Sequence, residues 1–539
     1  MKTSNFNVTH LVFILLVHFA ARIQTLFLDL QPYSFVDEAM VAHNVFGMLY
    51  NNTWLLPPDL LVGAFSYYVT YVPSVFIDAF FGSLSVNESH VISRCVVVAL
   101  SALLPIYVFK TCAMLGFGAK VSLISAIVAS LSPFSLAYSR IVYPDHLMPG
   151  LIAVLIFQIA KLQLVRNQRE FKYLDLGYLK QALLPIGLIV GLVISNKYNG
   201  VYVFPAIGFG LFVVEYSHQK KITIALANSL SQLIVVTIFA TLVFAALMWK
   251  PILHGEVQKA IMDATARYKG GHLGATTSSP LIHYAQVIWF QPLGILGGLS
   301  SLFGLIYLIK TKHYPIVVFL LSLTATFFLA NSQYVVFFPR NITILSPIPF
   351  ILAGAGLTIW LKNIPRNING DLSYTVMFTV FMVAIGLLAE PIVRFGIQLQ
   401  NDYQVDSRKV AGEWIEKNIK ADSKIGFIHP AWGAPYTSRT DLNKIEMPSA
   451  AWSEQKFAEV DYFVYDSWQL DVYREGHSMY ELNPYSEHHF LNTPRHRPGD
   501  EFPKKFETAT TDFILLRVFN SAQHYGPTVY VLSHKRNLK

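Results

Sequence analysis

Long apolar stretches separated by short polar segments make up most of the chain before residue 400. A helix needs about 20 mostly apolar residues to cross the hydrocarbon core of a bilayer. The pattern predicts about eleven transmembrane helices, and the first has no signal-peptide cleavage site after it, so we expect it to be retained. The predicted spans are residues 10–28, 92–109, 121–137, 147–165, 182–195, 200–216, 224–248, 290–309, 315–330, 342–361 and 374–393.

The composition agrees with a polytopic α-helical membrane protein. The 539 residues are 53% hydrophobic and 14% charged, with a mean hydropathy of +0.43. Such a chain is too apolar for an ordinary soluble enzyme. The formal net charge is +8, but the basic residues lie mainly in short loops between the spans, where membrane topology accounts for them. We therefore expect the lipid bilayer as a partner, and no nucleic acid.

The segment Pro57–Gly82 decides the orientation of every later span. It is apolar enough to cross the membrane, but Pro73 and Asp78 interrupt it, and its tyrosines are typical of a membrane interface. If it crossed, the loop around Arg166 would face outward, against the positive-inside rule. If it lies in the interface, the basic loops face the cytoplasm. This second topology predicts a cytoplasmic N-terminus in the cell (inner or plasma) membrane and a tail on its outer side.

The tail differs from the rest of the chain, because the long apolar stretches stop after Gln398. Residues 406–419 have the pattern of an amphipathic helix. Short strands are predicted at residues 424–429, 461–466, 512–518 and 528–533. We predict two domains: a transmembrane domain of residues 1–396, with a first outer loop of residues 29–91, and a soluble outer α/β domain of residues 397–539.

Adjacent carboxylates, Asp37 and Glu38, lie just beyond the first span. Carboxylates beside a hydrophobic helix are costly to desolvate, which favours a chemical role over a role in packing. The predicted topology places further charged residues on the same outer face: Arg140, Asp145, Lys197 and Arg340.

Two of these residues also have structural interpretations. Asp145 follows the helix-breaking Pro144 and suits the N-cap of the next helix. Lys197 runs against the positive-inside bias and suits a snorkelling anchor. The planar guanidinium of Arg340 can hold two oxygens of a phosphate. Together, carboxylates and cations at one membrane face favour a reaction on a lipid-borne phosphate.

A sugar linked to a polyprenyl phosphate fits this arrangement. Its prenyl chain stays in the bilayer, while its sugar lies outside, where a carboxylate can take the proton from an attacking hydroxyl. Lys197 or Arg340 would stabilise the charge on the departing phosphate as the anomeric carbon becomes oxocarbenium-like. The predicted partners are therefore a polyprenyl-phosphate-linked sugar donor and an acceptor hydroxyl on a lipid, a glycan or a protein.

Several short motifs occur in order along residues 10–393. They are Asp37-Glu38, Ser139-Arg140 followed by Asp145, Gly191-Leu192 through Lys197-Tyr198, Gly271-His272-Leu273-Gly274 with Tyr284, and Pro339-Arg340 followed by Pro347. In their order and spacing the chain resembles the protein mannosyltransferase and lipid A aminoarabinose transferase group of GT-C glycosyltransferases (glycosyltransferase families 39 and 83).

The resemblance implies a GT-C fold and an inverting, polyprenyl-phosphate-dependent glycosyltransferase. It implies Asp37 as the catalytic base, with Glu38 tuning or orienting it, and Asp145 in the second acidic position of the family. It implies no cofactor and no catalytic metal. Because His146 lies beside these carboxylates in the predicted site, a divalent ion stays open as an alternative.

The remaining candidate residues would bind substrate. Lys197, Arg340 and Arg140 are the cations expected to bind the donor phosphate. His272 and Tyr284 belong to the motif between the seventh and eighth spans, which we expect to form a substrate loop.

Two alternative functions use the same residues. A transporter or flippase of lipid-linked sugars would also need charges in a membrane cavity, although transporter sites usually lie near the bilayer midplane. A lipid-linked O-antigen ligase or polymerase would share the transfer chemistry and differ mainly in the size of the donor.

The first prediction concerns the proposed base. Asp37→Asn keeps the size of the side chain but cannot accept a proton, so we expect a folded protein that no longer transfers sugar from a polyprenyl-phosphate donor. Transfer by purified protein measures this. Near-normal turnover by the variant would remove Asp37 as the base.

Overall fold

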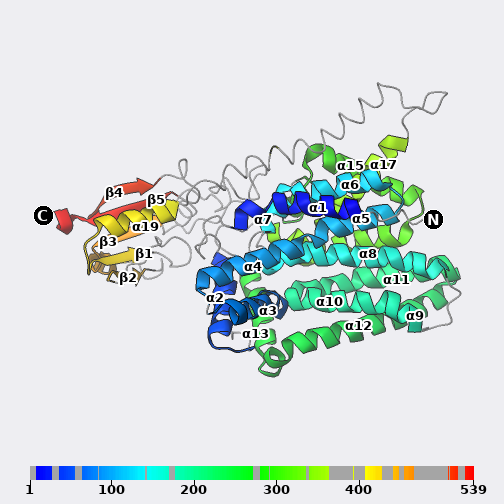
Figure 1. The fold of residues 1–539 in the computed structure, drawn as a ribbon, viewed down its shortest axis with the longest axis horizontal. Helices are drawn as coiled ribbons and strands as arrows, with labels where there is room; N and C mark the ends of the chain where they lie inside the picture. Colours follow the sequence, from blue (N-terminus) through cyan, green and yellow to red (C-terminus); the bar gives the residue numbers. More distant parts are fainter. Residues whose placement is uncertain are drawn as a thin grey trace, which may run out of the picture.

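The computed structural model comprises a long helical bundle and a small sheet domain (Figure 1). The description below covers residues 8–26, 36–54, 63–82, 84–139, 142–168, 176–270, 280–290, 292–334, 339–362, 393, 407–427, 441–447, 454–466, 508, 510–519 and 528–538.

The bundle is built from α-helices joined by short 3₁₀ turns. The α-helices are α1 (Val8–Ala20), α2 (Val36–Tyr50), α3 (Ala64–Phe81), α4 (Val86–Ser101), α5 (Leu103–Met114), α6 (Ala119–Leu131), α7 (Pro133–Tyr138), α8 (Leu147–Gln168), α9 (Leu176–Tyr178), α10 (Leu184–Asn196), α11 (Val203–Gln219), α12 (Ile222–Leu253), α13 (Glu256–Gly270), α14 (Pro280–Phe290), α15 (Gly294–Lys310), α16 (Tyr314–Ser332) and α17 (Pro347–Lys362). The 3₁₀ turns are η1 (Ile23–Leu26), η2 (Pro144–His146), η4 (Tyr198–Tyr202) and η5 (Pro339–Leu345), and η3 (Leu179–Leu183) is a π-helical turn.

Helices match the predicted spans wherever the structure describes them. By length and composition, 6 helical segments can cross a membrane: Glu88–Met114, Pro144–Arg166, Leu176–Asn196, Tyr198–Gln219, Ile222–Leu253 and Tyr314–Ser332. Shorter apolar helices occupy the predicted spans that begin at residues 10, 121, 290 and 342. Residues 374–392 of the last predicted span lie outside the described residues. The structure therefore confirms a polytopic helical membrane domain, while the predicted number of eleven spans stays a prediction.

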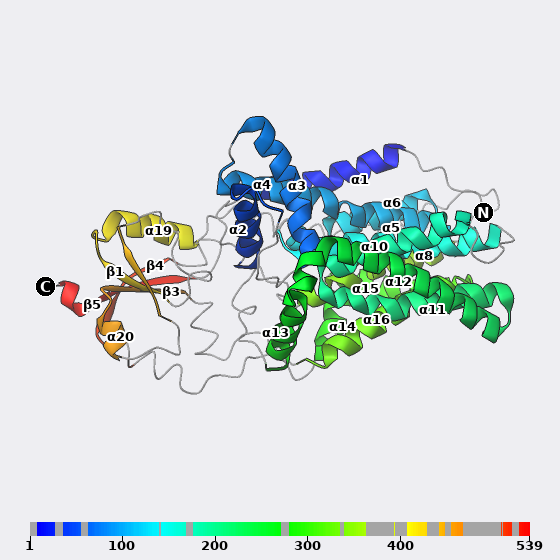
Figure 2. The same cartoon turned by 90° about the horizontal axis from the view of Figure 1, so that it is seen from below.

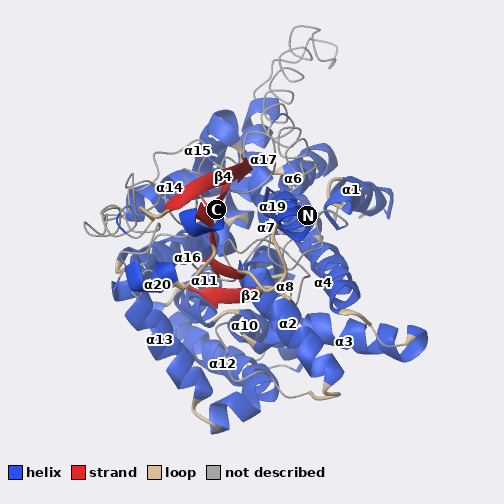
Figure 3. Ribbon diagram, turned by 90° about the vertical axis from the view of Figure 1, so that its left-hand side faces the viewer, coloured by secondary structure: helices blue, strands red, loops and turns tan. Residues whose placement is uncertain are grey.

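The described part of the segment that decided the predicted topology forms helix α3. This helix is not among those long and apolar enough to cross a membrane. Pro73 lies inside the helix and does not end it. Figure 3, viewed along the bundle, shows α3 extending sideways from the other helices. Both observations agree with the interfacial alternative rather than with a span.

Among the described residues, one large hydrophobic core runs through the bundle, and most of its side chains come from α5, α6, α8, α10, α11, α12 and α14 to α17. Helices α15 and α17 approach especially closely. A Cβ on Gly304 would collide with the backbone carbonyl oxygen of Leu352, and a Cβ on Gly356 would collide with that of Ser300. Small residues allow backbones to approach closely, as in membrane helix packing generally.

A smaller core, which we call the end cluster, lies at one end of the bundle. It includes Val41 and Val45 from α2, Tyr67 and Tyr71 from α3, and Val142 just before η2. Because α2, α3 and the segment before η2 share this cluster, it joins three separate parts of the chain into one packed layer.

The C-terminal region is an α/β domain, as predicted. Its strands are β1 (Lys424–Phe427), β2 (Asn443–Glu446), β3 (Tyr462–Asp466), β4 (Phe513–Phe519) and β5 (Val529–His534), in the sheet order β2-β1-β3-β5-β4. β1 pairs in parallel with β2 and β3, whereas β5 pairs antiparallel with β3 and β4. The predicted strands correspond to β1, β3, β4 and β5. The sequence did not predict β2, because its four residues alternate too briefly to be distinguished from a loop.

Two helices pack on this sheet. α19 (Ser407–Asn418) buries Ala411 and Ile415 against Val464 and Val531, while α20 (Glu454–Ala458) places Phe457 in a second cluster with Phe463 and Phe513. α19 matches the predicted amphipathic helix.

In Figures 1 and 2 the domain lies beyond the end of the bundle that carries α2 and α13. The predicted boundary at residue 396 lies outside the described residues and stays a prediction.

The close approach of α15 and α17 gives a test of the bundle. Gly304→Ala places a methyl group against a backbone carbonyl and is expected to lower the free energy of unfolding by about 1–3 kcal/mol. Thermal unfolding in detergent measures the change. Gly208→Ala is the matched control, since its Cβ would meet only Leu233 Cδ2 at 3.5 Å. Equal melting temperatures for the two variants would contradict the packing described here.

Candidate active site

Three of the predicted site residues lie on segments that break the spanning helices. Asp145 is in η2, Lys197 follows the end of α10, and Arg340 is in η5. Elements η2 and η5 pack against each other and against α8. Residues more than 190 positions apart in the sequence (145 and 340) are thereby brought to one end of the bundle, close to the end cluster.

Asn196 holds this arrangement together. Its side-chain Nδ2 donates to the backbone oxygen of Pro144 at 2.7 Å, and its Oδ1 accepts from Ser66 Oγ at 2.7 Å. Its own backbone oxygen accepts from Gly63 N at 3.2 Å. A Cβ on Gly63 would collide with the carbonyl of Ser195, so only glycine permits this approach. Asn196 therefore joins α3, the end of α10 and η2 in one hydrogen-bonded unit.

Lys197 and Asp145 form a largely buried ion pair. Lys197 Nζ lies 2.5 Å from Asp145 Oδ1, and the side chains are 21% and 1% exposed, respectively. Lys197 Nζ also donates to Asn341 Oδ1, in η5, at 3.4 Å. A buried carboxylate needs such a partner, because removing an unpaired charge from water is very costly. Asp145 Oδ1 thus accepts from Lys197 rather than from a backbone amide, so the N-cap interpretation does not hold.

The second oxygen of Asp145 differs from the first. Asp145 Oδ2 is buried and makes no hydrogen bond to any residue that the structure describes. Buried polar atoms are nearly always bonded to protein, water or ligand. Lys197 therefore holds one oxygen of the carboxylate, whereas none of the described residues donates to the other.

Arg340 lies over an aromatic ring of the same segment. Its guanidinium carbon is 5.2 Å from the centre of the Tyr143 ring, within the range of a cation–π interaction. Tyr143 precedes Asp145 by two residues. The structure therefore places Arg340 against the segment that carries Asp145 and pairs Asp145 with Lys197, while the roles predicted for these residues stay predictions.

Asp37 and Glu38 lie in the first turn of α2, which begins at Val36. Their side chains are outside the described part of the structure. One turn further along α2, Val41 is fully buried in the end cluster together with Val142. The start of α2 is therefore anchored to the layer that holds the segment before Asp145, and the roles of Asp37 and Glu38 stay predictions.

The other predicted residues are placed differently. Arg140 and His272 lie outside the described residues. Tyr284 lies in helix α14 and is fully buried in the main core, so its predicted place in a loop is wrong. Tyr284 was placed in a loop because it lies between the predicted spans 224–248 and 290–309, whereas the structure forms α14 there. Among the described residues, no group of three or more His, Cys, Asp or Glu side chains is arranged to hold a metal ion.

The sequence did not single out Asn196, Asn341 or Arg22 as site residues. Asn196 and Asn341 each stand next to a predicted cation, which was the only available signal. Arg22 lies inside the first predicted span. A charge within an apolar stretch is itself a signal for function, which could have pointed to this residue.

The chain was compared with known proteins. No protein family and no curated protein matches it by sequence. Solved structures do match it. The apo oligosaccharyltransferase of Archaeoglobus fulgidus has a TM-score of 0.59 and 13% identity, over 89% of this chain and 71% of that one. The oligosaccharyltransferase AglB of Archaeoglobus fulgidus in complex with an inhibitory peptide and a dolichol-phosphate has a TM-score of 0.57 and 12% identity, over 96% and 74%.

A third structure matches over nearly its full length. Apo ArnT from Cupriavidus metallidurans has a TM-score of 0.50 and 13% identity, over 97% of each chain. These proteins are GT-C glycosyltransferases. The chain has the GT-C fold. Within this GT-C fold, the Asp145–Lys197 pair and Arg340 lie where η2, η4 and η5 interrupt the membrane helices.

Removing one partner of the ion pair tests its energetic importance. Lys197→Met leaves Asp145 buried without its cation and is expected to cost about 3–5 kcal/mol of stability. The double variant Lys197→Met/Asp145→Asn removes both charges and should recover most of that loss. Thermal unfolding of the purified variants measures both. A single variant as stable as the double variant would show that the pair contributes nothing to folding.

Proposed function

We propose that this protein transfers a sugar from a polyprenyl-phosphate-linked donor to a hydroxyl acceptor, with inversion at the anomeric carbon. The observation that carries the proposal is the buried Asp145–Lys197 pair, with Asn341 and Arg340 beside it, at the helix breaks of a GT-C fold. Two cations and a buried carboxylate, one oxygen of which accepts from no described residue, suit a reaction in which a phosphate leaves and a proton is taken up.

The cations are assigned to the donor phosphate. Lys197 has three N–H donors, of which Asp145 and Asn341 accept two. The third suits a phosphate oxygen. Arg340, stacked on Tyr143, presents a planar fork that matches two phosphate oxygens. Together they would stabilise the negative charge that develops as the bond between the anomeric carbon and the phosphate oxygen breaks.

The base is assigned to Asp37. Its carboxylate would take the proton of the acceptor hydroxyl as the hydroxyl oxygen attacks the anomeric carbon, and the phosphate would leave on the opposite face. Glu38 would orient Asp37. Asp145 would hold Lys197 in place and, through Oδ2, accept a hydroxyl of the substrate. Attack opposite the leaving group gives inversion in one step.

The donor class is supported by a protein of the same fold, since AglB of Archaeoglobus fulgidus has been solved with a dolichol-phosphate. A lipid phosphate of this kind would place its chain among the apolar helices and its phosphate at their ends. We further propose that the site faces the outer side of the membrane, with the N-terminus in the cytoplasm, because that orientation gives cytoplasmic loops the excess of basic residues.

Arg340→Ala tests the donor assignment. Loss of a charged hydrogen bond of about 1.5–3 kcal/mol corresponds to a decrease in kcat/KM for the donor of roughly ten- to a hundredfold. The dependence on acceptor concentration should change much less. Initial rates measured while each substrate is varied in turn separate the two effects.

Arg340→Lys is the matched control, because it keeps the charge and loses the planar fork, so an intermediate donor effect is expected. An effect confined to the acceptor would reassign Arg340. These assays in detergent also distinguish the transporter alternative, because a transporter or flippase forms no glycosylated product.

A further inference from the structure

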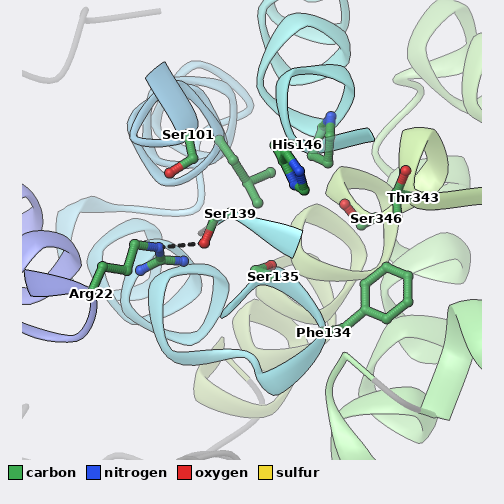
Figure 4. A pocket seen from close by; sticks show the side chains of 10 residues that line it. Arg22, Ser101, Phe134, Ser135, Ser139, His146, Thr343 and Ser346 are labelled. Carbon is green, nitrogen blue, oxygen red and sulfur yellow. Dashed lines mark hydrogen bonds between the residues drawn. The ribbon is translucent and has the colours of Figure 1, made fainter. Parts of the chain in front are cut away.

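A small cavity with several polar side chains in its lining adjoins the candidate site inside the bundle (Figure 4). Its polar lining includes Arg22, Ser135, Ser139, His146, Thr343 and Ser346. His146 directly follows Asp145, and Thr343 Oγ1 donates to the backbone oxygen of Arg340 at 2.9 Å. The cavity is therefore bordered by both segments that carry the candidate site, η2 and η5.

Arg22 is the charged residue of this cavity, and it is only 1% exposed. Its Nε donates to Ser139 Oγ at 2.6 Å, and its Nη1 donates to the backbone oxygens of Ser130 at 2.9 Å and His18 at 3.2 Å. One guanidinium thus connects the end of α1 with α6 and with the end of α7. A buried guanidinium is costly and is kept only where its geometry is used.

The hydrogen bond to Ser139 leads towards Asp145. Ser139 is the C-cap of α7, six positions before Asp145. The other end of this segment is held by Asn196, which bonds Pro144. Arg22 and Asn196 therefore bond residues before and after Tyr143, whose ring lies under Arg340.

The cavity is also lined by two buried hydroxyls from distant parts of the chain, Ser135 and Ser346. Ser135 Oγ and Ser346 Oγ are buried and make no hydrogen bond within the described residues. The cavity volume is about 10 Å³, which is enough for about one water molecule. One water bonded to both hydroxyls would link α7 to the segment that follows η5.

We propose that Arg22 is a positioning residue for the transfer reaction: through Ser139 it fixes the segment that carries Asp145, and a buried water between Ser135 and Ser346 extends this support to η5. The inference rests on the proposed function for its catalytic part. Its structural part is independent of the sugar, the acceptor and the donor.

Hydrogen–deuterium exchange of the full-length protein tests the structural part. Arg22→Lys cannot reproduce the three hydrogen bonds of the guanidinium described above. Ser139→Ala removes only one hydrogen-bond acceptor, so it tests the same contact if Arg22→Lys does not fold. In both variants, amide exchange in residues 142–147 should be at least about fivefold faster than in the unmodified protein. Unchanged exchange there in both variants overturns the proposal.

Arg166→Lys is the matched control. Arg166 is also a buried arginine, but it pairs with Glu215 at 3.0 Å through a separate network. Its substitution should leave exchange in residues 142–147 unchanged. If Arg166→Lys accelerates this segment as much as Arg22→Lys does, the effect is a general loosening of the bundle and the proposal is overturned.

Ser346→Ala tests the water link. Exchange in residues 339–346 should increase, whereas exchange in residues 142–147 should change less than in Arg22→Lys. Unchanged exchange in residues 339–346 overturns the link through water.

Kinetics test the catalytic part. Per folded molecule, Arg22→Lys is expected to lower kcat by about tenfold or more, because small misplacements of reacting groups are costly. The KM for the donor should change less than about threefold, since Arg22 does not touch the substrate. Unaltered kcat, or an effect confined to KM, overturns the positioning role. If the unmodified protein transfers no sugar, the proposed function fails, while the exchange experiment still decides whether Arg22 fixes the Asp145 segment.

Discussion

The structure depends on the pairing of charges that lie inside a low-dielectric bundle. Asp145 is 1% exposed and Lys197 is its cation. Neither residue is tolerable there alone, because the desolvation of an unpaired ion costs several kcal/mol, on the order of a destabilising core mutation. The pair therefore dictates that the end of α10 and the start of α8 meet, and Asn341 brings η5 to the same point. The breaks in three spanning segments are organised around this contact.

A second buried pair clarifies what is special about the first. In the Arg166–Glu215 pair, Glu215 accepts at Oε2 from Arg166 and Asn228 and at Oε1 from Gln232. Both oxygens are satisfied, as a structural ion pair requires. Asp145 has only Oδ1 bonded within the described residues. The two carboxylates are similarly buried, yet only Asp145 has an oxygen to which no described residue donates, and the proposed function draws on this difference.

Both hydrogen bonds and apolar packing hold the segment that carries Asp145. Arg22, Ser139 and Asn196 hold the ends of the segment from α7 to η2, while the valines of α2 and the tyrosines of α3 pack against Val142 from the other side. Hydrogen bonds give direction and apolar packing gives rigidity, so Tyr143 and Asp145 have few alternative positions. Preorganised charges of this kind are the main source of catalytic power in reactions where a charge develops on a leaving group.

The sequence by itself determined the membrane class, the approximate positions of the spans and most of the C-terminal strands, because hydrophobic length and alternation are local properties. It also placed Asp145, Lys197 and Arg340 among the candidates, since charges beside apolar helices stand out. Only the tertiary structure showed that Lys197 bonds Asp145 rather than serving as an anchor, that Arg166 is buried with Glu215 rather than lying in a loop, and that Tyr284 belongs to the core. Arg22 and Asn196 emerged in the same way. Each of these facts is a contact between residues far apart in the chain, and no local pattern specifies which distant partner a polar side chain will meet.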